Sequence, residues 1–259
     1  MPLHVSSTVW ALTYALVAGL LLFDYYFHVR KAHVPSLRES ASWSMAYVGI
    51  ALLFGVALTA WGRPGMGTEY FAGYITEKAL SVDNVFVFLV ILSGFRVPRP
   101  YQQKVLLFGI AFSLVARIGL IFLGAALLER YAWVFYVFGL LLLMTAGNLL
   151  RPRSGEQEGL VMRLARRGFH TSEHYDGQKL FTDEQGRRVM TPLMLVMIVI
   201  GGTDVLFALD SIPAIFGLTQ DTFVVVTATA FSLLGLRQLY FLIDHLLERL
   251  LYLPYGLAA

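Results

Sequence analysis

Seven apolar stretches, each about 20 residues long or more, constrain this chain more than any other feature of its sequence. A helix rises ~1.5 Å per residue, so about 20 residues cross the ~30 Å hydrocarbon core of a bilayer. The stretches fall at residues 8–27, 41–61, 71–95, 105–128, 131–150, 191–218 and 222–247. Charged residues make up 14% of the chain, against ~25% in a typical soluble domain. We therefore predict an all-α polytopic membrane protein, a single integral membrane domain (1–259) embedded in the lipid bilayer.

The basic residues predict the orientation of these helices. Fifteen Lys and Arg residues fall in loops on one side of the predicted membrane, and two, Arg63 and Arg130, fall on the other. Because cytoplasmic loops are enriched in Lys and Arg, the N-terminus is predicted outside, and the C-terminus and the 151–190 loop in the cytoplasm. The net charge of +3 follows from this asymmetry and does not indicate a nucleic-acid partner.

The 151–190 loop is the long polar segment of the chain. Residues 158–168 have the pattern of an amphipathic surface helix, and residues 174–190 are expected to form a hairpin. Forty residues are too few for an independent core, so we expect a gate cover or a docking surface for protein partners.

The sequence shows no nucleophile elbow, phosphate loop or His–acid dyad, so we expect no catalytic residues and no enzyme. It also has no cysteine, which excludes disulfides and thiolate metal sites.

Two octets place carboxylates inside apolar stretches. They are EKALSVDN at 77–84 and DVLFALDS at 204–211, and each has an acid, five intervening residues, an Asp and a small polar residue. A charge at the centre of a membrane helix costs roughly 2.5–3.5 kcal/mol, so such residues are expected to face the protein interior at a functional site.

The similarity between the octets extends to the helices that follow them. AFSL at 111–114 precedes Arg117, and AFSL at 230–233 precedes Arg237. The octets lie in the third and sixth stretches, which enter the membrane from opposite sides. We predict an inverted three-helix repeat, a common transporter architecture with its site at the midplane, in which the second repeat is truncated. Chance similarity between apolar helices is the alternative.

The spacing within each octet determines which side chains share a helix face. Residues six apart on a regular helix are separated by ~240°, so the two acids of one octet point in different directions. Glu77 shares a face with Asn84 and Ser81, and Asp204 shares one with Ser211.

Both acids of one octet reach a single ion only if the helix unwinds. Gly201-Gly202 and Pro213 are expected to break the second octet's helix. The first octet has only Gly73 nearby, so convergence there is expected mainly between the two copies.

The side chains of the octets favour a hard cation. Asp, Glu, Asn and Ser oxygens suit Mn²⁺, Mg²⁺ or Ca²⁺ and disfavour Zn²⁺ and Cu⁺. Two alternatives remain open: a proton relay without metal, and a structural network in which the four acids pair with Lys78, Arg117 and Arg237. Pairing leaves one negative charge over, which favours the cation.

The other polar residues are expected at the membrane surface. We predict that Asp24 and Asp244 are interfacial and that the loop histidines are solvated. These histidines are His28, His33, His170 and His174.

Three segments resemble the signatures of the TerC family, including its Alx branch. They are EYFAGY at 69–74 with EKALSVDNVFV at 77–87, TPLM at 191–194 with DVLFALDSIPA at 204–214, and GLRQLYFL at 235–242. The resemblance implies a multi-pass inner-membrane protein linked to manganese efflux and tellurite resistance, related to the LysE transporter superfamily. Gly201 stands where some members have an acid.

The resemblance also implies a site. The candidate metal ligands that it implies are Glu77, Asp83, Asn84, Asp204 and Asp210. From the octet and repeat patterns themselves, we expect these ligands to be supported by Ser81, Arg117, Ser211, Pro213 and Arg237. The expected function is export of divalent cations, first of all Mn²⁺, from the cytoplasm through a midplane carboxylate site, with no cofactor required. The alternative is a non-transporting membrane hub for tellurite or stress resistance that recruits partners through the 151–190 loop.

Overall fold

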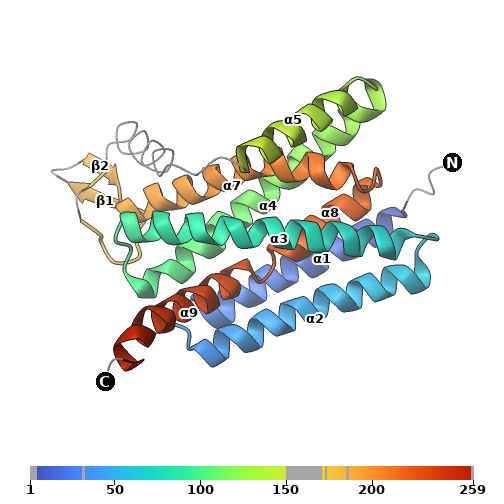
Figure 1. Cartoon of the computed structure of the whole chain (residues 1–259). Helices are drawn as coiled ribbons and strands as arrows, with labels where there is room; N and C mark the ends of the chain where they lie inside the picture. The colour runs from blue at the N-terminus through green and yellow to red at the C-terminus, as the bar shows by residue number, and fades with distance from the viewer. Residues whose placement is uncertain (1–4, 31–32, 150–170, 173, 185–186, 258–259) are drawn as a thin grey trace.

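The computed structural model of the chain describes residues 5–30, 33–149, 171–172, 174–184 and 187–257. This part is a bundle of helices lying side by side, with one β-hairpin at one end (Figure 1). The surface helix predicted at 158–168 and His170 lie outside the described residues. The elements are α1 (Ser7–Asp24), the π-helix η1 (Tyr25–Val29), α2 (Leu37–Trp61), α3 (Met66–Gly94), α4 (Arg99–Arg130), α5 (Val134–Leu149), β1 (Phe181–Glu184), β2 (Arg187–Met190), α7 (Pro192–Phe216), α8 (Thr222–Leu233) and α9 (Leu236–Leu257).

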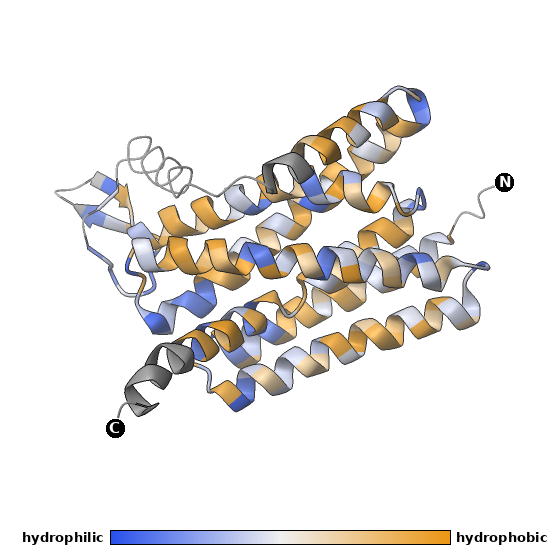
Figure 2. Cartoon of the chain, in the orientation of Figure 1, coloured by the Kyte–Doolittle hydropathy of each residue, from blue (hydrophilic) through white to orange (hydrophobic). Residues whose placement is uncertain are grey.

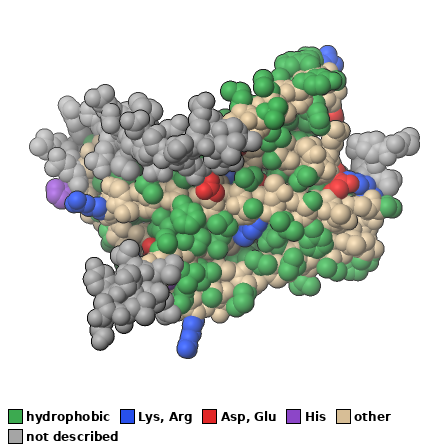
Figure 3. Space-filling view, viewed as in Figure 1, with side chains coloured by type: hydrophobic (Ala, Val, Ile, Leu, Met, Phe, Trp, Pro, Cys, Tyr) green, Lys and Arg blue, Asp and Glu red, His purple; other side chains and the backbone are tan. Residues whose placement is uncertain are grey.

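The helices have the length and composition of membrane spans. Five segments of the described chain are apolar and long enough to cross a bilayer: Ser7–Val29, Leu37–Trp61, Arg99–Arg130, Pro192–Phe216 and Thr222–Leu247. α3 is 29 residues long but carries the first charged octet. Apolar residues run along the helices in Figure 2, and hydrophobic side chains cover much of the face in Figure 3. The chain is an all-α, multi-pass integral membrane protein.

Side-chain caps define where several helices begin. Ser36 and Glu39 each accept a hydrogen bond from the other's backbone N–H, forming a capping box at the start of α2. The Asp221 carboxylate accepts hydrogen bonds from Phe223 N–H and Val224 N–H at the start of α8. Each cap satisfies N–H groups that have no acceptor within the helix, which fixes the register in which the helix enters the bundle.

The two charged octets lie on neighbouring helices. α3 and α7 pack against each other and run antiparallel, while α4 packs mainly on α7 and α8 mainly on α3 (Figure 1). This arrangement is the one that entry from opposite sides requires. The inverted repeat itself stays a prediction.

Glycine lets α4 approach α7 closely. A Cβ atom at Gly109 would lie 2.7 Å from Ile200 Cγ2, and one at Gly201 would lie 2.7 Å from Phe112 Cδ1. Small residues at such contacts allow membrane helices to pack backbone to backbone. This close approach places the Arg117 segment of α4 against the acidic octet of α7.

The prediction that α7 breaks was wrong. The helix is continuous from Pro192 to Phe216, with Pro213 inside it. Gly201 does not interrupt the helix; its missing side chain allows the close contact with α4. Pro213 lies in the last turn and lacks the N–H that would bond to Leu209 O, so any distortion it causes is confined to the end of the helix.

The interruption occurs instead between α8 and α9. The predicted stretch 222–247 divides at Leu234-Gly235, with α8 ending at Leu233 and α9 beginning at Leu236. Gly235 has φ of 83°, a left-handed conformation that glycine adopts readily. A Cβ atom there would also lie 2.9 Å from Cβ of Tyr47 on α2. Packing against α2 and the backbone conformation therefore both require glycine.

The hairpin marks one end of the bundle, which we call the hairpin end. β1 and β2 pair antiparallel, with Phe181 opposite Met190. Thr191, directly after β2, donates its hydroxyl hydrogen bond to Lys179 O at 2.8 Å, while its Oγ1 accepts one from Met194 N–H. The hairpin is thereby joined directly to the first turn of α7.

At the opposite end, ion pairs join two loops. Arg63, between α2 and α3, donates to Glu69 Oε1 at 2.7 Å and to Asp221 Oδ2 at 3.2 Å. The Thr219 hydroxyl, between α7 and α8, also donates to Glu69. The α2–α3 loop is thus tied to the α7–α8 loop through the Arg63 guanidinium and the carboxylates of Glu69 and Asp221.

Replacing Glu69 by Gln is expected to destabilise the protein at neutral pH but not in acid. The Arg63 guanidinium holds the pKa of the Glu69 carboxyl below its ordinary 4.5. This contribution, about 1 kcal/mol for a partly exposed pair, is present above pH 4.5 and is lost as pH falls through the lowered pKa. Unfolding midpoints of the detergent-purified variant against pH measure it. Glu129→Gln, at an exposed site in α4, is the control, and a pH-independent Glu69→Gln deficit would contradict the assignment.

Candidate functional site

Arg117 joins the two octets in the interior. Its guanidinium bonds Glu77 Oε1 from α3 through Nη1, and Asp204 Oδ1 from α7 through Nη2 at 3.0 Å. The three side chains are 0%, 1% and 2% exposed. Buried ions cost several kcal/mol each unless they are paired, so one arginine between two acids makes the burial tolerable.

Neutral side chains complete this arrangement. Asn84 Nδ2 donates to Asp204 Oδ1 at 3.2 Å, and the Ser113 hydroxyl donates to Asp204 Oδ2. Ser211 Oγ accepts from Arg117 Nη1 at 3.2 Å. We refer to these side chains as the central cluster: Glu77, Asn84, Ser113, Arg117, Asp204 and Ser211.

The central cluster is not fully satisfied. Glu77 Oε2 is buried and accepts a hydrogen bond from no described residue, and Arg117 Nε donates to none. Two carboxylates and one guanidinium in direct contact carry a net charge of −1. A buried oxygen with unused lone pairs, beside an excess negative charge, is a site that attracts a cation.

Lys78 of α3 contacts the end of α8. Lys78 Nζ donates to the backbone carbonyl of Ser232 at 3.0 Å, and Ser81 Oγ lies 3.5 Å from Ser232 Oγ. The last carbonyls of a helix lack intrahelical donors and carry partial negative charge, so a cationic group is favourable there. The α8–α9 interruption therefore exposes a carbonyl that accepts the Lys78 ammonium.

The four acids of the octets do not converge. Asp83 is half-buried and Asp210 is exposed, and neither belongs to the central cluster. The helices of both octets stay regular, so residues six apart remain on different faces, as their spacing requires. Within the described residues, no three His, Asp or Glu side chains form a group that holds a metal ion. Of the five predicted ligands, the structure brings Glu77, Asn84 and Asp204 together and leaves Asp83 and Asp210 outside the central cluster; that any of them binds a metal stays a prediction.

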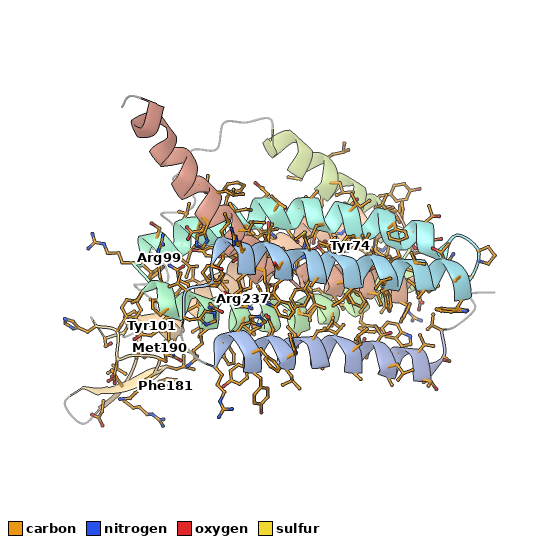
Figure 4. All side chains as sticks on the ribbon, turned by 90° about the horizontal axis from the view of Figure 1, so that it is seen from below. Tyr74, Arg99, Tyr101, Phe181, Met190 and Arg237 are labelled. Carbon is orange, nitrogen blue, oxygen red and sulfur yellow. The ribbon has the colours of Figure 1, made fainter. Side chains whose placement is uncertain are left out.

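Arg237 lies in a different cluster from the one predicted. It donates to Asp24 Oδ2 at 3.1 Å and Oδ1 at 2.7 Å, and also to Gln103 Oε1. Gln238 donates to Asp24 Oδ1 at 2.8 Å, and His28 Nδ1 lies 3.3 Å from the same oxygen. We call these five residues the second cluster. Figure 4 shows Arg237 inside the bundle, between Arg99 at the hairpin end and Tyr74 toward the other end.

The sequence patterns did not predict the second cluster. Asp24 and His28 were predicted interfacial and solvated, yet they are 5% and 6% exposed. They lie near the end of an apolar stretch, where an acid is ordinarily assigned to the interface. The signal available was their spacing of four residues, which places an acid and a histidine on one helix face.

The fold and the central cluster define a multi-pass membrane protein with a buried site built from carboxylates on two antiparallel helices. The family model described as "Integral membrane protein TerC family" matches residues 62–259. This chain belongs to the TerC family. It matches no solved structure.

Curated relatives agree with this family. The chain is 60% identical over 260 residues to an uncharacterized membrane protein of Mycobacterium tuberculosis (strain CDC 1551 / Oshkosh), covering 98% of this chain and 66% of that protein. It is 43% identical to an uncharacterized membrane protein of Myxococcus xanthus, covering 98% and 81%. It is 37% identical to Alx of Escherichia coli K12, described as a candidate membrane-bound redox modulator, covering 96% and 81%. The chain thus spans 66% of the length of the mycobacterial relative.

Proposed function

We propose that this chain is a membrane transporter that exports a hard divalent cation, first of all Mn²⁺, from the cytoplasm through the central cluster. The observation that carries the proposal is the buried Glu77 Oε2, which no described hydrogen-bond donor satisfies, in a cluster of charge −1. Asn84 and the serine hydroxyls add neutral oxygens, the ligand type that Mn²⁺ and Mg²⁺ share with carboxylates.

Arg117 has a defined part in this proposal. Its guanidinium lies between Glu77 and Asp204, so a divalent ion reaches both carboxylates only when Arg117 withdraws from at least one of them. Arginine then substitutes for the cation when the cation leaves. The two carboxylates are never left unpaired in the bilayer, where the cost of exposed charge is highest.

Acids from α3 and α7 favour alternating access as the mode of transport. Transporters commonly place their site near the midplane between helices that enter from opposite sides. Under the predicted orientation, with the N-terminus outside, the hairpin end faces the cytoplasm, and the Arg63–Glu69–Asp221 ion pairs lie on the outer side. Export then requires these outer ion pairs to separate, while the hairpin end admits the ion.

The Alx relatives' description as redox modulators is compatible with cation transport. This chain has no cysteine, so a thiol–disulfide mechanism within it is excluded. A redox effect of this chain would follow instead from the level of a redox-active cation such as manganese in the cell. The cation, rather than the protein, would then undergo the redox chemistry.

Removing either carboxylate of the central cluster is expected to weaken Mn²⁺ binding about tenfold or more, which is about 1.4 kcal/mol. The variants are Glu77→Gln and Asp204→Asn, each isosteric and each removing one negative charge. Purified protein in detergent is titrated with Mn²⁺ by calorimetry, and efflux is followed in cells loaded with manganese.

Asp83→Asn and Asp210→Asn are the matched controls, because they remove the same charge from the same helices outside the cluster. Unchanged affinity in the controls with loss in Glu77→Gln and Asp204→Asn supports the proposal. Loss of Mn²⁺ affinity only in the two controls would place the cation at Asp83 and Asp210 and contradict the proposal.

A further inference from the structure

The second cluster is a buried polar site for which the proposed function has no use. Asp24 and Arg237 form a bidentate ion pair, so their charges cancel. His28 Nδ1 approaches Asp24 at 3.3 Å, and its ring meets Trp43 edge to face with centroids 4.7 Å apart. Burying a histidine beside a carboxylate inside a membrane protein is costly, and ionisable residues in such positions usually belong to functional sites. Local π-helix, here η1 with His28 in it, is also found frequently at functional sites.

Unsatisfied polar atoms line a cavity at this position. Ser40 Oγ and Gln238 Oε1 are buried and have no hydrogen-bond partner among the described residues. Both residues line a cavity with His28, Glu39 and Trp43, whose volume of about 10 Å³ is close to the smallest that holds one water. The Glu39 side chain is 32% exposed, so the cavity connects a solvent-accessible carboxylate with the buried imidazole.

The charged and titratable groups around His28 come from three helices. Asp24 is on α1, Glu39 lines the cavity from α2 with His33 Nε2 3.2 Å from its Oε1, and Arg237 lines the cavity from α9. Tyr47 of α2 interacts electrostatically with Asp24 and Arg237. The charges of the Asp24–Arg237 ion pair cancel, so a positive charge gained by His28 would lie beside the Asp24 carboxylate.

The second cluster is connected to the first octet, which contributes Glu77 and Asn84 to the central cluster, through the α8–α9 interruption. Ser232, just before the interruption, contacts Lys78 and Ser81 of the first octet. Arg237, just after it, is held by Asp24. A change in the Asp24–Arg237 pair therefore acts on the short segment 232–237 that also contacts the first octet.

We propose that the second cluster is a proton-binding site, in which the His28 imidazole takes up one proton through the Glu39 side of the cavity. The N–H bond formed converts the imidazole to imidazolium, and the cluster gains one positive charge. The imidazolium then competes with Arg237 for Asp24. We further assign this proton as the counter-ion of the exported cation, a step that rests on the proposed function.

Proton binding is tested without any transport measurement. Trp10, Trp61 and Trp133 are replaced by Phe, so that Trp43 alone reports on the His28 ring by fluorescence. A fluorescence transition is expected as the pH is lowered and the imidazole takes up its proton. It should persist in His174→Gln, an exposed histidine of the hairpin segment, and vanish in His28→Gln. The same transition in His28→Gln would assign the proton to another group, such as Glu39, and overturn the proposal.

A second protein distinguishes a transition near His28 from a global change of the molecule. A chain that keeps only Trp10, which packs on Tyr14, Phe122 and Phe223, is expected to show no such transition. Equal transitions in the Trp43-only and Trp10-only proteins would indicate a global change and overturn the assignment to His28.

The counter-ion step is tested in proteoliposomes that contain a pH-sensitive dye and face a Mn²⁺ gradient. The wild type is expected to move protons against Mn²⁺, and His28→Gln is expected to reduce proton movement about tenfold while keeping Mn²⁺ affinity. Proton movement equal to wild type in His28→Gln would overturn the counter-ion assignment. A wild type that neither binds nor moves Mn²⁺ would instead refute the proposed function, and the Trp43 titration would still decide the proton site.

Discussion

Replacing Arg117 by Met is expected to lower the free energy of unfolding by about 3–5 kcal/mol, the usual loss when one partner of a buried ion pair is removed. Met fills similar volume, so the loss reports on charge rather than on a cavity. Glu77 and Asp204 would keep their burial but lose the guanidinium that contacts both. The variant is compared with wild type by denaturant unfolding in micelles, followed by circular dichroism.

Two further variants identify the cause of this loss. Arg130→Met removes an arginine from the exposed end of the same helix and is expected to change stability little. The triple variant Arg117→Met, Glu77→Gln, Asp204→Asn removes all three charges and is expected to recover a large part of the lost stability. A triple variant less stable than Arg117→Met alone would show that the arginine contributes mainly by packing.

Introducing Val at Gly109 is expected to destabilise the protein by about 1–3 kcal/mol, as overpacking of a tight contact usually does. A Cβ atom there would lie 2.7 Å from Ile200 Cγ2, and Ile200 is β-branched and fully buried, so it has no room to move. α4 and α7 would have to separate. Ser113 and Arg117 would then move away from Asp204, and cation affinity is expected to fall together with stability.

Gly119→Val is the control for this prediction. It makes the same substitution ten residues along α4, where a Cβ atom meets nothing within 4 Å. Its effect on the free energy of unfolding is expected to stay within about 0.5 kcal/mol. Both variants are measured by unfolding and by Mn²⁺ titration. A deficit of equal size in the two would attribute the effect to valine in a helix rather than to the α4–α7 contact.

Helical spacing was the most reliable guide that the sequence offered. It predicted that Glu77 shares a face with Ser81 and Asn84, and Asp204 with Ser211, and these five side chains are buried. The same spacing separated Asp83 and Asp210 from them. The family resemblance also places both of these acids in the ligand set, and that part of the set stays a prediction.

Glycine and arginine were harder to interpret because each serves several roles. Gly201 was expected to break a helix, but it provides a close contact with Phe112, and the left-handed Gly235 marks the interruption. Arg117 and Arg237 follow identical AFSL segments, yet only Arg117 contacts the octet acids. Arg237 pairs with Asp24, which lies 213 positions away in sequence, and a local pattern cannot predict such a long-range choice.

The interruption at Leu234-Gly235 also has a mechanical consequence. α9 is a 22-residue rod, ~33 Å long at ~1.5 Å per residue, and it is attached to α8 through this short joint. Rotation at the backbone dihedrals of two residues would swing the whole rod without unwinding a turn of either helix. The joint lies against Tyr47, so the pivot is fixed to α2 rather than free in the bilayer. A small angular change at this pivot is magnified along the rod into a displacement of several ångströms at its far end.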